Sequence, residues 1–427
     1  MLDIKFIAEN TEWVKNSLKR KAFPAEKIDE LLNLYYEMNK LKTSSQALAE
    51  EKNKLSNSIK SASSEERPEI IAKSKSVGEQ FKQEQEKLTE IQAKYDDLML
   101  RMPNYPSEDS PDGEDDSFNV VARKVGELPN FDFEPKDHIE LMEINDWSEM
   151  ERIANVSGSR TYAIKDDLAQ LEIAIHMLVM DKLRQHGFTL ITVPAISKEK
   201  PLYNQGYLPF ARDEIYYMPA DDVYLSGTAE LILNSLHADE LLSEANLPIL
   251  YAGFSPCFRR EAGAAGKDTR GLVRVHQFFK TEQFVICKND IAESEKWHKK
   301  LLQISEEVLQ DLELPYQVLE VCTGDMGAPK YRQYDLEAWV PSQQCYRETH
   351  SCSNITEWQA RRTNLRYRDN TDGKVKFCHT LNNTGIATPR ALVPFIENHQ
   401  QADGTVRIPE KLQPYLGGKK YIGKNAK

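Results

Sequence analysis

The sequence predicts an α+β protein in which a long antiparallel α-helical hairpin precedes a domain built on an antiparallel β-sheet. Three observations carry this prediction. Two stretches near the N-terminus repeat apolar residues at steps of three and four, which is the period of packed helices. Helical and strand-like segments then alternate to the end of the chain. Two β-rich runs, at 249–258 and 272–286, flank a glycine-bearing loop and predict a long hairpin of strands.

The first patterned stretch predicts one helix over residues 28–59, and the second predicts another that ends near residue 102. Ser45 and Lys52 interrupt the first seam, and Ser74 and Glu84 interrupt the second. Periodicity alone fits equally well a coiled coil that joins two chains. The short loop between two matched seams favours a hairpin that closes on itself as an arm. The apolar positions of the first seam are Leu31, Leu34, Met38, Leu41, Leu48, Leu55 and Ile59.

Basic side chains lie along this arm and near its tip. Scattered lysines on a helix usually form only a solvated face. Contact with RNA phosphates is the sharper hypothesis, because lysine and arginine neutralise a phosphate backbone. The candidate side chains are Lys52, Lys54, Lys60, Arg67, Lys73 and Lys75.

The stretch after the second helix is rich in proline, serine and acidic residues. Pro103 ends the helix, and NYPSEDSPDGEDDS at 104–117 is predicted to be a linker. We therefore expect two domains, 1–110 and 111–427. In the second, residues 166–185 predict a helix with one apolar side, and residues 189–193 predict a strand that stops at a proline.

Composition limits the function classes. The chain of 427 residues carries a formal net charge of −12, so RNA contact would need local basic patches. The N-terminus lacks the apolar core of a signal peptide, and the longest apolar stretch, 173–180, is too short to span a bilayer. The six cysteines form no C-x-x-C pair, which argues against structural zinc and a disulfide framework. We expect a cytoplasmic protein without membrane association.

The most informative segment is PCFRREAGAAGKDTRGLVRVHQF at 256–278. It places Arg259 at a strand end beside a flexible loop, where a guanidinium can bind phosphate through two donors. Glycines in the loop allow the backbone to approach a ligand. A surface hairpin with charged edges would have the same composition, and the two common glycine-rich nucleotide motifs are absent. The loop glycines are Gly263, Gly266 and Gly271.

F-R-x-E at 258–261, followed by A-G-x-A-G-x-D-T-R-G-L-x-R-x-H-Q-F, resembles motif 2 of class II aminoacyl-tRNA synthetases, and the seryl family in particular. Other segments agree in the family's order. G-F at 187–188 with the proline at 194 resembles motif 1, the dimer-forming element, and T-A-E at 228–230 resembles the serine loop. R-E-T-H-S-C-S-N at 347–354 with Q-A-R-R at 359–362 resembles a seryl signature, and 382–390 resembles motif 3.

This resemblance implies a class II synthetase fold and an arm that grips tRNA. The implied enzyme uses ATP to activate L-serine as seryl-adenylate and transfers the serine to tRNA(Ser), or also to tRNA(Sec) in an organism that makes selenocysteine. It further implies a homodimer through motif 1. Two other classes of protein are alternatives. A catalytically inactive paralogue that binds RNA or a protein partner would lose the motif residues, and a relative that loads a carrier protein would lack the hairpin.

The resemblance also implies roles for individual residues. Arg259 is expected at the α-phosphate of ATP and Arg390 at the γ-phosphate side, while Glu348 and Ser351 are expected to hold Mg²⁺. Glu261 is expected to accept from the adenine amino group. The implied ATP contacts are Arg259, Arg260, Glu261, Val275, Phe278, Glu348, Thr349, His350, Ser351 and Arg390. The implied serine contacts are Thr228, Ala229, Glu230, Arg259, Glu282 and Thr384.

Three residues depart from the family pattern. His350 stands where serine is expected, which leaves the neighbouring ATP contact open although Ser351 keeps its place. Asn383 replaces a common glycine, and asparagine would tolerate the positive φ of a turn there. Thr384 stands where serine is frequent and retains the hydroxyl.

Overall fold

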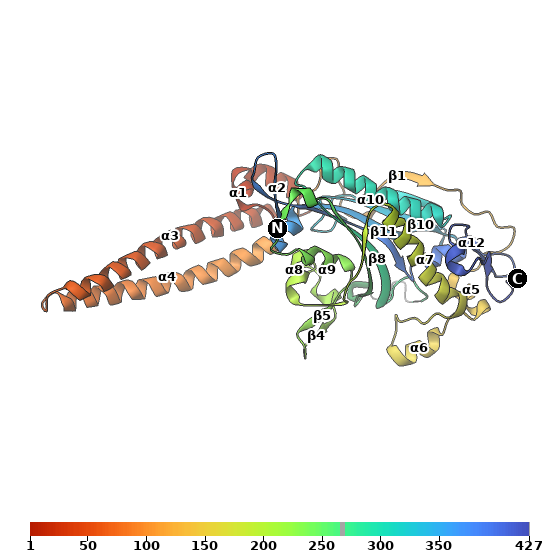
Figure 1. The fold of residues 1–427 in the computed structure, drawn as a ribbon, viewed down its shortest axis with the longest axis horizontal. Coiled ribbons are helices and arrows are strands. Elements are labelled where there is room, and N and C mark those ends of the chain that lie inside the picture. Colours follow the sequence, from red (N-terminus) through yellow and green to blue (C-terminus); the bar gives the residue numbers. More distant parts are fainter. Residues whose placement is uncertain (265–269, 427) are drawn as a thin grey trace. The chain divides into compact units, whose positions relative to one another are not determined.

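The structure is a computed structural model that describes residues 1–264 and 270–426 (Figure 1). The chain forms two compact units, Met1–Pro103 and Asn104–Lys427. This division precedes the one predicted between residues 110 and 111. The first unit is helical and the second combines helices with a large sheet, so the predicted α+β class is confirmed. Among the described residues, no helix has the length and apolar character that crossing a membrane requires.

The first unit consists of two short helices and a long hairpin. The hairpin helices pack against one another along their length, as the matched seams predict (Figure 1). Pro68 lies in the first turn of the second long helix, where its missing N–H costs no helical hydrogen bond. The helices are α1 (Ile4–Glu9), α2 (Thr11–Lys19), α3 (Ala25–Ser61) and α4 (Arg67–Arg101).

Polar interruptions of each seam have partners on the opposite helix of the hairpin. Ser44 donates to the carboxylate of Glu84 at 2.8 Å, and the Gln85 amide donates to the buried hydroxyl of Ser45. The ammonium of Lys52 lies 5.8 Å from the centre of the Phe81 ring. A polar layer of this kind favours one alignment of two helices, because sliding them would leave buried polar groups without partners.

An eight-stranded sheet forms the centre of the second unit, in the order β1-β9-β10-β11-β14-β8-β7-β2. All neighbours are antiparallel except β2 and β7, which are parallel. β7 and β8 confirm the predicted hairpin, although the second strand begins at Gln277, five positions after the predicted start at Leu272. The strands are β1 (Val120–Val125), β2 (Thr189–Thr192), β7 (Ile249–Phe258), β8 (Gln277–Cys287), β9 (Tyr316–Glu320), β10 (Arg332–Val340), β11 (Cys345–Thr356) and β14 (His379–Thr388).

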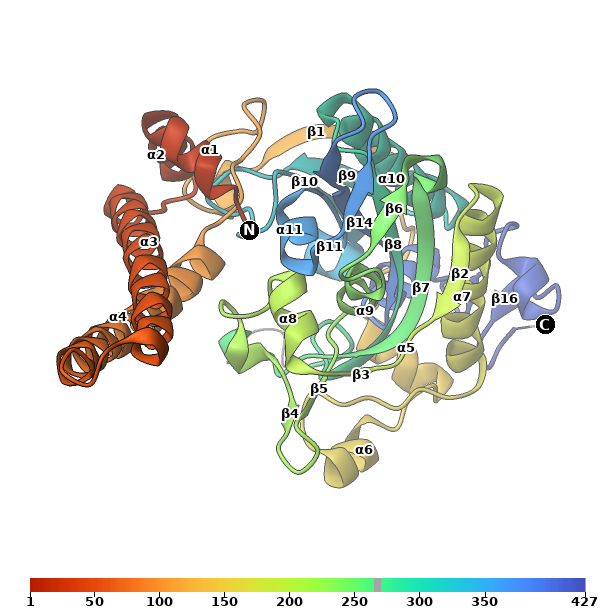
Figure 2. The same cartoon turned by 60° about the vertical axis from the view of Figure 1, so that its left-hand side comes forward.

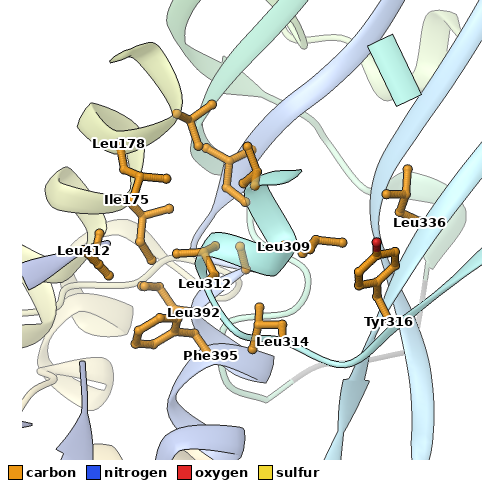
Figure 3. Packing of buried hydrophobic residues seen from close by; sticks show 14 of the residues in the cluster. Ile175, Leu178, Leu309, Leu312, Leu314, Tyr316, Leu336, Leu392, Phe395 and Leu412 are labelled. Carbon is orange, nitrogen blue, oxygen red and sulfur yellow. The ribbon is translucent and has the colours of Figure 1, made fainter. Parts of the chain in front are cut away.

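Helices cover both faces of this sheet (Figure 2). Successive side chains of a strand point to opposite faces, so Val285 and Cys287 join one apolar cluster while Phe284 and Ile286 join another. The first cluster lies under three helices and is seen in Figure 3. These helices are α7 (Asp166–Gln185), with its predicted bounds, α10 (Ile291–Asp311) and α12 (Leu392–His399). The opposite face is covered by α8 (Glu199–Gln205), α9 (Ala229–Leu236) and α11 (Trp358–Thr363).

Smaller elements complete the second unit. The remaining helices are α5 (His138–Asn145) and α6 (Met150–Ser157). The short strands are β3 (Ile196–Ser197), β4 (Tyr217–Met218), β5 (Val223–Leu225), β6 (Leu241–Ser243), β12 (Arg366–Arg368), β13 (Val375–Phe377), β15 (Val406–Arg407) and β16 (Tyr421–Ile422).

The predicted linker is wrong over its first residues, which pack on the second unit. The backbone N–H of Asn104 donates to Ala328 at 2.8 Å, and its side-chain amide donates to Ile355 at 2.8 Å. The N–H of Ser107 donates to Tyr331 at 2.7 Å, and the side chains of Asn104 and Ser107 are buried. Polar composition suggested solvent, but here these polar groups are satisfied by the loop before β10 and by the end of β11.

Candidate active site

A cavity of about 290 Å³ opens on the face of the sheet that carries α8, α9 and α11. Strands β8, β11 and β14 supply its floor, and the N-terminal end of α9 contributes to its wall. Most of the residues predicted for ATP, serine and Mg²⁺ line it. These are Thr228, Glu230, Arg259, Glu261, Val275, Phe278, Glu348, Thr349, Ser351, Thr384 and Arg390.

A bulge in β11 explains the spacing of the E-x-x-S residues. Side chains three positions apart on a regular strand would point to opposite faces. The register of β11 against β10 shifts between Glu348 and His350, which leaves Thr349 as an extra residue. Glu348 and Ser351 therefore both line the cavity.

A second bulge lies in β14, between Thr384 and Ile386, and Gly385 is its extra residue. A Cβ at position 385 would lie 2.9 Å from the carbonyl oxygen of Thr281, so only glycine fits without a backbone shift. Before this bulge, Asn382 and Thr384 both face the cavity as alternate residues. Asn382 and Thr384 thus line the cavity before the bulge, and Arg390 lines it after the strand has ended.

The turn expected around Asn383 is absent, because this residue lies within the extended strand β14. Its buried amide donates to the carbonyl of Leu301 and to the hydroxyl of Ser305, both at 2.9 Å. Asparagine at this position therefore fastens the strand to α10 and needs no positive φ.

The guanidinium of Arg259 lies just beyond the end of β7, within the cavity. It donates to the carbonyl of Gly227 at 3.5 Å and lies 5.2 Å from the centre of the Phe278 ring. Its Nε is buried and has no hydrogen-bond partner within the described parts of the chain. Nearby Tyr207 and further acidic groups raise the pKa of Arg259 against the opposing effect of burial. The side chain is a fixed cation with a donor free for a ligand.

Arg390 and Glu348 meet on the other side of the cavity. Arg390 donates to the backbone carbonyls of Val273 at 3.3 Å and Glu348 at 3.4 Å. Burial lowers the pKa of Arg390, and the attraction of Glu348 opposes this shift. The Ser351 hydroxyl accepts from the amide of Gln333 at 3.0 Å, which fixes its position beside Glu348. Two arginines and a carboxylate thus converge on one space, as predicted.

A recess lined by buried polar groups adjoins the two arginines. Thr228 caps α9 by accepting from the backbone N–H of Glu230 at 3.2 Å. The Glu230 carboxylate accepts from the amides of Gln359 at 2.8 Å and Gln205 at 3.0 Å. Gln359 belongs to the Q-A-R-R segment, so this part of the signature orients a carboxylate that lines the cavity.

Glu282 lies beneath this recess and is fully buried. It forms an ion pair with Lys280 and accepts from the Asn382 amide nitrogen at 3.1 Å. Burial raises the pKa of Glu282, and Lys280 opposes that shift. Because the amide nitrogen of Asn382 is engaged, its Oδ1 remains as an acceptor, and no described residue bonds to it. Asn382 is 6% exposed and lines the cavity.

The cavity leaves out a few of the predicted residues, among them Glu282, which is fully buried beneath it. Ala229 is buried in the apolar cluster behind α9, and the Arg260 side chain is exposed outside the cavity. His350 is fully buried on the opposite face of β11, and burial lowers its pKa to about 4. Gly266 of the predicted loop lies outside the described residues.

Other lining residues were not assigned a role from the sequence. Strand alternation from Phe278 through Glu282 could have identified Lys280, and alternation before Thr384 could have identified Asn382. The remainder come from α8, from loops and from the end of β14, and several of them lie within the motif 2 and motif 3 segments without a role of their own. They are Gln205, Tyr207, Leu272, Val273, Arg274, Lys330, Ala387, Thr388 and Pro389.

Comparisons with known proteins agree with this geometry. Residues 1–106 match the family model of the seryl-tRNA synthetase N-terminal domain, and residues 217–399 match that of the tRNA synthetase class II core domain (G, H, P, S and T). The serine–tRNA ligase of Deinococcus radiodurans is 49% identical over 423 residues, which cover 99% of each chain. The chain belongs to the seryl-tRNA synthetase family.

Solved members of the seryl-tRNA synthetase family share its fold. The crystal structure of the Pyrococcus horikoshii enzyme complexed with ATP matches with a TM-score of 0.91 at 39% identity, covering 99% of both chains. That of the cytoplasmic enzyme of Naegleria fowleri in complex with AMP matches with a TM-score of 0.87 at 29% identity, covering 100% of this chain and 99% of that one.

Proposed function

We propose that this chain is a serine–tRNA ligase, which activates L-serine with ATP and transfers it to tRNA(Ser). The observation that carries the proposal is the single cavity in which Arg259, Arg390 and Glu348 adjoin a polar recess. Full-length similarity to serine–tRNA ligases supports the same conclusion. A catalytically inactive paralogue is not favoured, because the motif arginines and Glu348 are all present and lie together.

In the activation step, a serine carboxylate oxygen bonds to the α-phosphorus of ATP and pyrophosphate leaves. Negative charge develops on the phosphoryl oxygens, and fixed cations stabilise it. Arg259 is held by Gly227 and lies over Phe278, so it needs little reorganisation. We assign Arg259 to the α-phosphate and Arg390 to the γ-phosphate side. Phe278 would stack on adenine, with Val275 beside it, and Glu261 would accept from the adenine amino group.

The recess suits the polar groups of serine. The oriented carboxylate of Glu230 and the free Oδ1 of Asn382 offer acceptors for the ammonium group. The hydroxyl of Thr384 and the buried Glu282–Lys280 pair offer partners for the serine hydroxyl. Alanine would leave these groups unpaired, which is costly in a buried site, whereas threonine must be excluded by space.

Mg²⁺ would be held by Glu348 and Ser351 together with the ATP phosphates. Carboxylate and hydroxyl oxygens suit this hard ion, and Gln333 holds the Ser351 oxygen in place. No group of three or more His, Cys, Asp or Glu side chains forms a metal cage among the described residues. When bound, Mg²⁺ neutralises phosphate charge.

The arm would bind tRNA through its exposed lysines, including Lys54 and Lys60. We extend the proposal to tRNA(Sec) for an organism that makes selenocysteine. A reducing cytoplasm is the proposed location, with all six cysteines free.

We further propose a homodimer formed through α7 and the segment that follows it. Ile173 and Met177 of α7 are apolar yet 62% and 44% exposed, and both line an apolar groove of about 600 Å³. Val156 of the neighbouring α6 is 79% exposed. Contiguous exposed apolar surface of this kind marks a protein interface. Analytical ultracentrifugation of the pure chain would measure the dimer directly.

Serine-dependent exchange of pyrophosphate into ATP tests the proposed activity. The pure chain with Mg²⁺ should catalyse this exchange with serine and far more weakly with alanine or threonine. Absence of exchange under these conditions would overturn the proposal, because a non-catalytic paralogue could still bind RNA.

A further inference from the structure

The strands β11 and β14 separate where they enter the active site. Their described ladder runs from Thr356 opposite Thr380 to Cys352 opposite Asn383, and no further pair is formed toward the cavity within the described residues. Beyond that point β11 carries Ser351 and Glu348. The orientation of these side chains therefore cannot depend on backbone pairing between the two strands.

The side chain of His350 connects β11 to β14 in the part where their described backbones are not paired. Its Nε2 lies 2.9 Å from the carbonyl oxygen of Gly385, and its Nδ1 lies 2.8 Å from the hydroxyl of Thr349. A carbonyl oxygen only accepts, so Nε2 carries the proton and Nδ1 of the neutral ring is an acceptor for the Thr349 hydroxyl, whose single proton is shared with the Leu336 carbonyl oxygen at 3.2 Å. Thr349 and Gly385 are the extra residues of the two bulges. One fully buried imidazole thus connects both irregularities.

The bulges decide which side chains face the ligand. A slip of one residue in a strand moves every side chain to the other face, so moving the β11 bulge would turn Ser351 away from Glu348. Gly385 is confined on one side by the carbonyl of Thr281, 2.9 Å from where its Cβ would lie. His350 confines the same peptide from the β11 side.

We infer that His350 is a positioning residue that ties the bulge of β11 to that of β14 and thereby orients Glu348 and Ser351 toward ATP·Mg²⁺. This inference rests on the proposed function. It gives this departure from the family pattern a role that involves no contact with ATP.

Calorimetric titration of the full chain with ATP, with and without Mg²⁺, tests this role. His350→Gln carries an amide donor that reaches the position of Nε2, whereas His350→Asn reaches only the position of Nδ1. Loss of a group that orients metal ligands weakens metal affinity roughly 10- to 100-fold. We therefore expect His350→Asn to weaken ATP binding by about that factor only when Mg²⁺ is present, and His350→Gln to stay within about threefold of wild type.

His399→Asn is the matched control. His399 is also buried, donates from Nε2 to a backbone carbonyl, that of Leu312, at 2.8 Å, and lies outside the cavity. It should lower thermal stability without changing the effect of Mg²⁺ on ATP binding. Equal effects of His350→Asn and His350→Gln, or a loss that is the same without Mg²⁺, would overturn the inference.

Two further outcomes are distinguishable. If His350→Asn does not fold, His350→Gln decides alone: affinity for ATP·Mg²⁺ near wild type supports the inference, and a tenfold loss overturns it. If wild-type protein binds ATP·Mg²⁺ but shows no serine-dependent exchange, the proposed function fails, while the calorimetric comparison still measures the role of His350.

Discussion

Arg259 is the residue on which the proposed chemistry depends most directly. Its guanidinium lines the cavity, donates to the carbonyl of Gly227, and retains a buried Nε without a partner among the described residues. Such a donor is already aimed before a ligand arrives. Preorganised donors of this type stabilise charge that develops in a transition state.

Arg259→Ala should lower the rate of serine-dependent pyrophosphate exchange by about 10²- to 10³-fold, because one fixed donor to a developing charge contributes about 3–4 kcal/mol. Steady-state exchange kinetics measure the change. Thermal melting should show that the variant remains folded. Turnover close to wild type would contradict the assignment of Arg259 to the α-phosphate.

Thr384→Val removes a hydroxyl from the recess at nearly constant volume. If this hydroxyl pairs with serine, kcat/KM for serine should fall by up to about tenfold, the value of one hydrogen bond. The KM for ATP should not change, since Thr384 is assigned to the serine side. Exchange kinetics with serine and with alanine test this, and an unchanged preference for serine over alanine would contradict it.

At this scale, the sequence predicted which side chains gather but missed part of how they are supported. Motif spacing identified Glu348 and Ser351 because the family pattern already includes the bulge between them. Lys280 lies in β8 between Phe278 and Glu282, and Asn382 precedes Thr384 in β14. Both follow simple alternation, yet the motifs give them no role. His350 was predicted to touch ATP, but the bulge places it on the opposite face.

At the scale of single elements, the close contact at Gly385 in β14 leads to a prediction about stability. Gly385→Ala would bring a methyl group within 2.9 Å of the Thr281 carbonyl and force a backbone shift. We expect a loss of about 1–3 kcal/mol in the free energy of unfolding, the usual cost of overpacking, together with weaker exchange activity. Denaturant titration measures the first effect.

Gly327→Ala is the control, because a Cβ there would meet its nearest neighbour at 3.7 Å, an ordinary contact. Equal stability of the two variants would show that position 385 has more room than its contacts indicate.

The arm yields a second prediction at this scale. Lys52, Lys54 and Lys60 are all exposed on α3, and the ammonium of Lys52 also lies over the Phe81 ring. Reversing the charge of Lys54 and Lys60 should weaken tRNA binding and reduce its dependence on salt by about one unit of slope for each lost phosphate contact. Filter binding at several salt concentrations measures both. Pyrophosphate exchange should be unaffected, and a loss of exchange would point to damage elsewhere.

Elements with strong periodicity were predicted well. The two arm helices, α7 and the β7–β8 hairpin all follow from apolar spacing, because their packing partners are set by the same pattern. The segment at 104–110 has no such pattern, and only its tertiary hydrogen bonds reveal that it belongs to the second unit.

For the whole molecule, the division into two units predicts that serine activation and tRNA charging can be separated by removing the first unit. A protein that begins at Asn104 keeps the hydrogen bonds to Ala328, Ile355 and Tyr331, and should retain serine-dependent exchange. It should lose most charging of tRNA(Ser), since the arm is absent. Exchange and aminoacylation assays on the same preparation separate the two. A start near Phe118 would remove these hydrogen bonds and should lower the melting temperature.

The net charge of the chain predicts only part of how charge is distributed in the folded protein. The net charge of −12 argues against a general attraction to nucleic acid, yet the cavity collects several basic side chains from distant parts of the chain. Arg259, Arg274 and Lys280 come from one stretch of the sequence, and folding adds Lys330 and Arg390 from other parts of the chain. A local field of this kind is what a polyphosphate substrate requires.

The bulge at Gly385 also bears on any attempt to give this scaffold a new amino-acid preference. Residues 382 and 384 alternate toward the cavity on one side of the irregularity, while Arg390, which we propose for the phosphates, lies on the other side. A designer could therefore vary 382 and 384 in a library while holding 385 constant. The half of the pocket that handles the nucleotide would then keep its geometry through each round of selection.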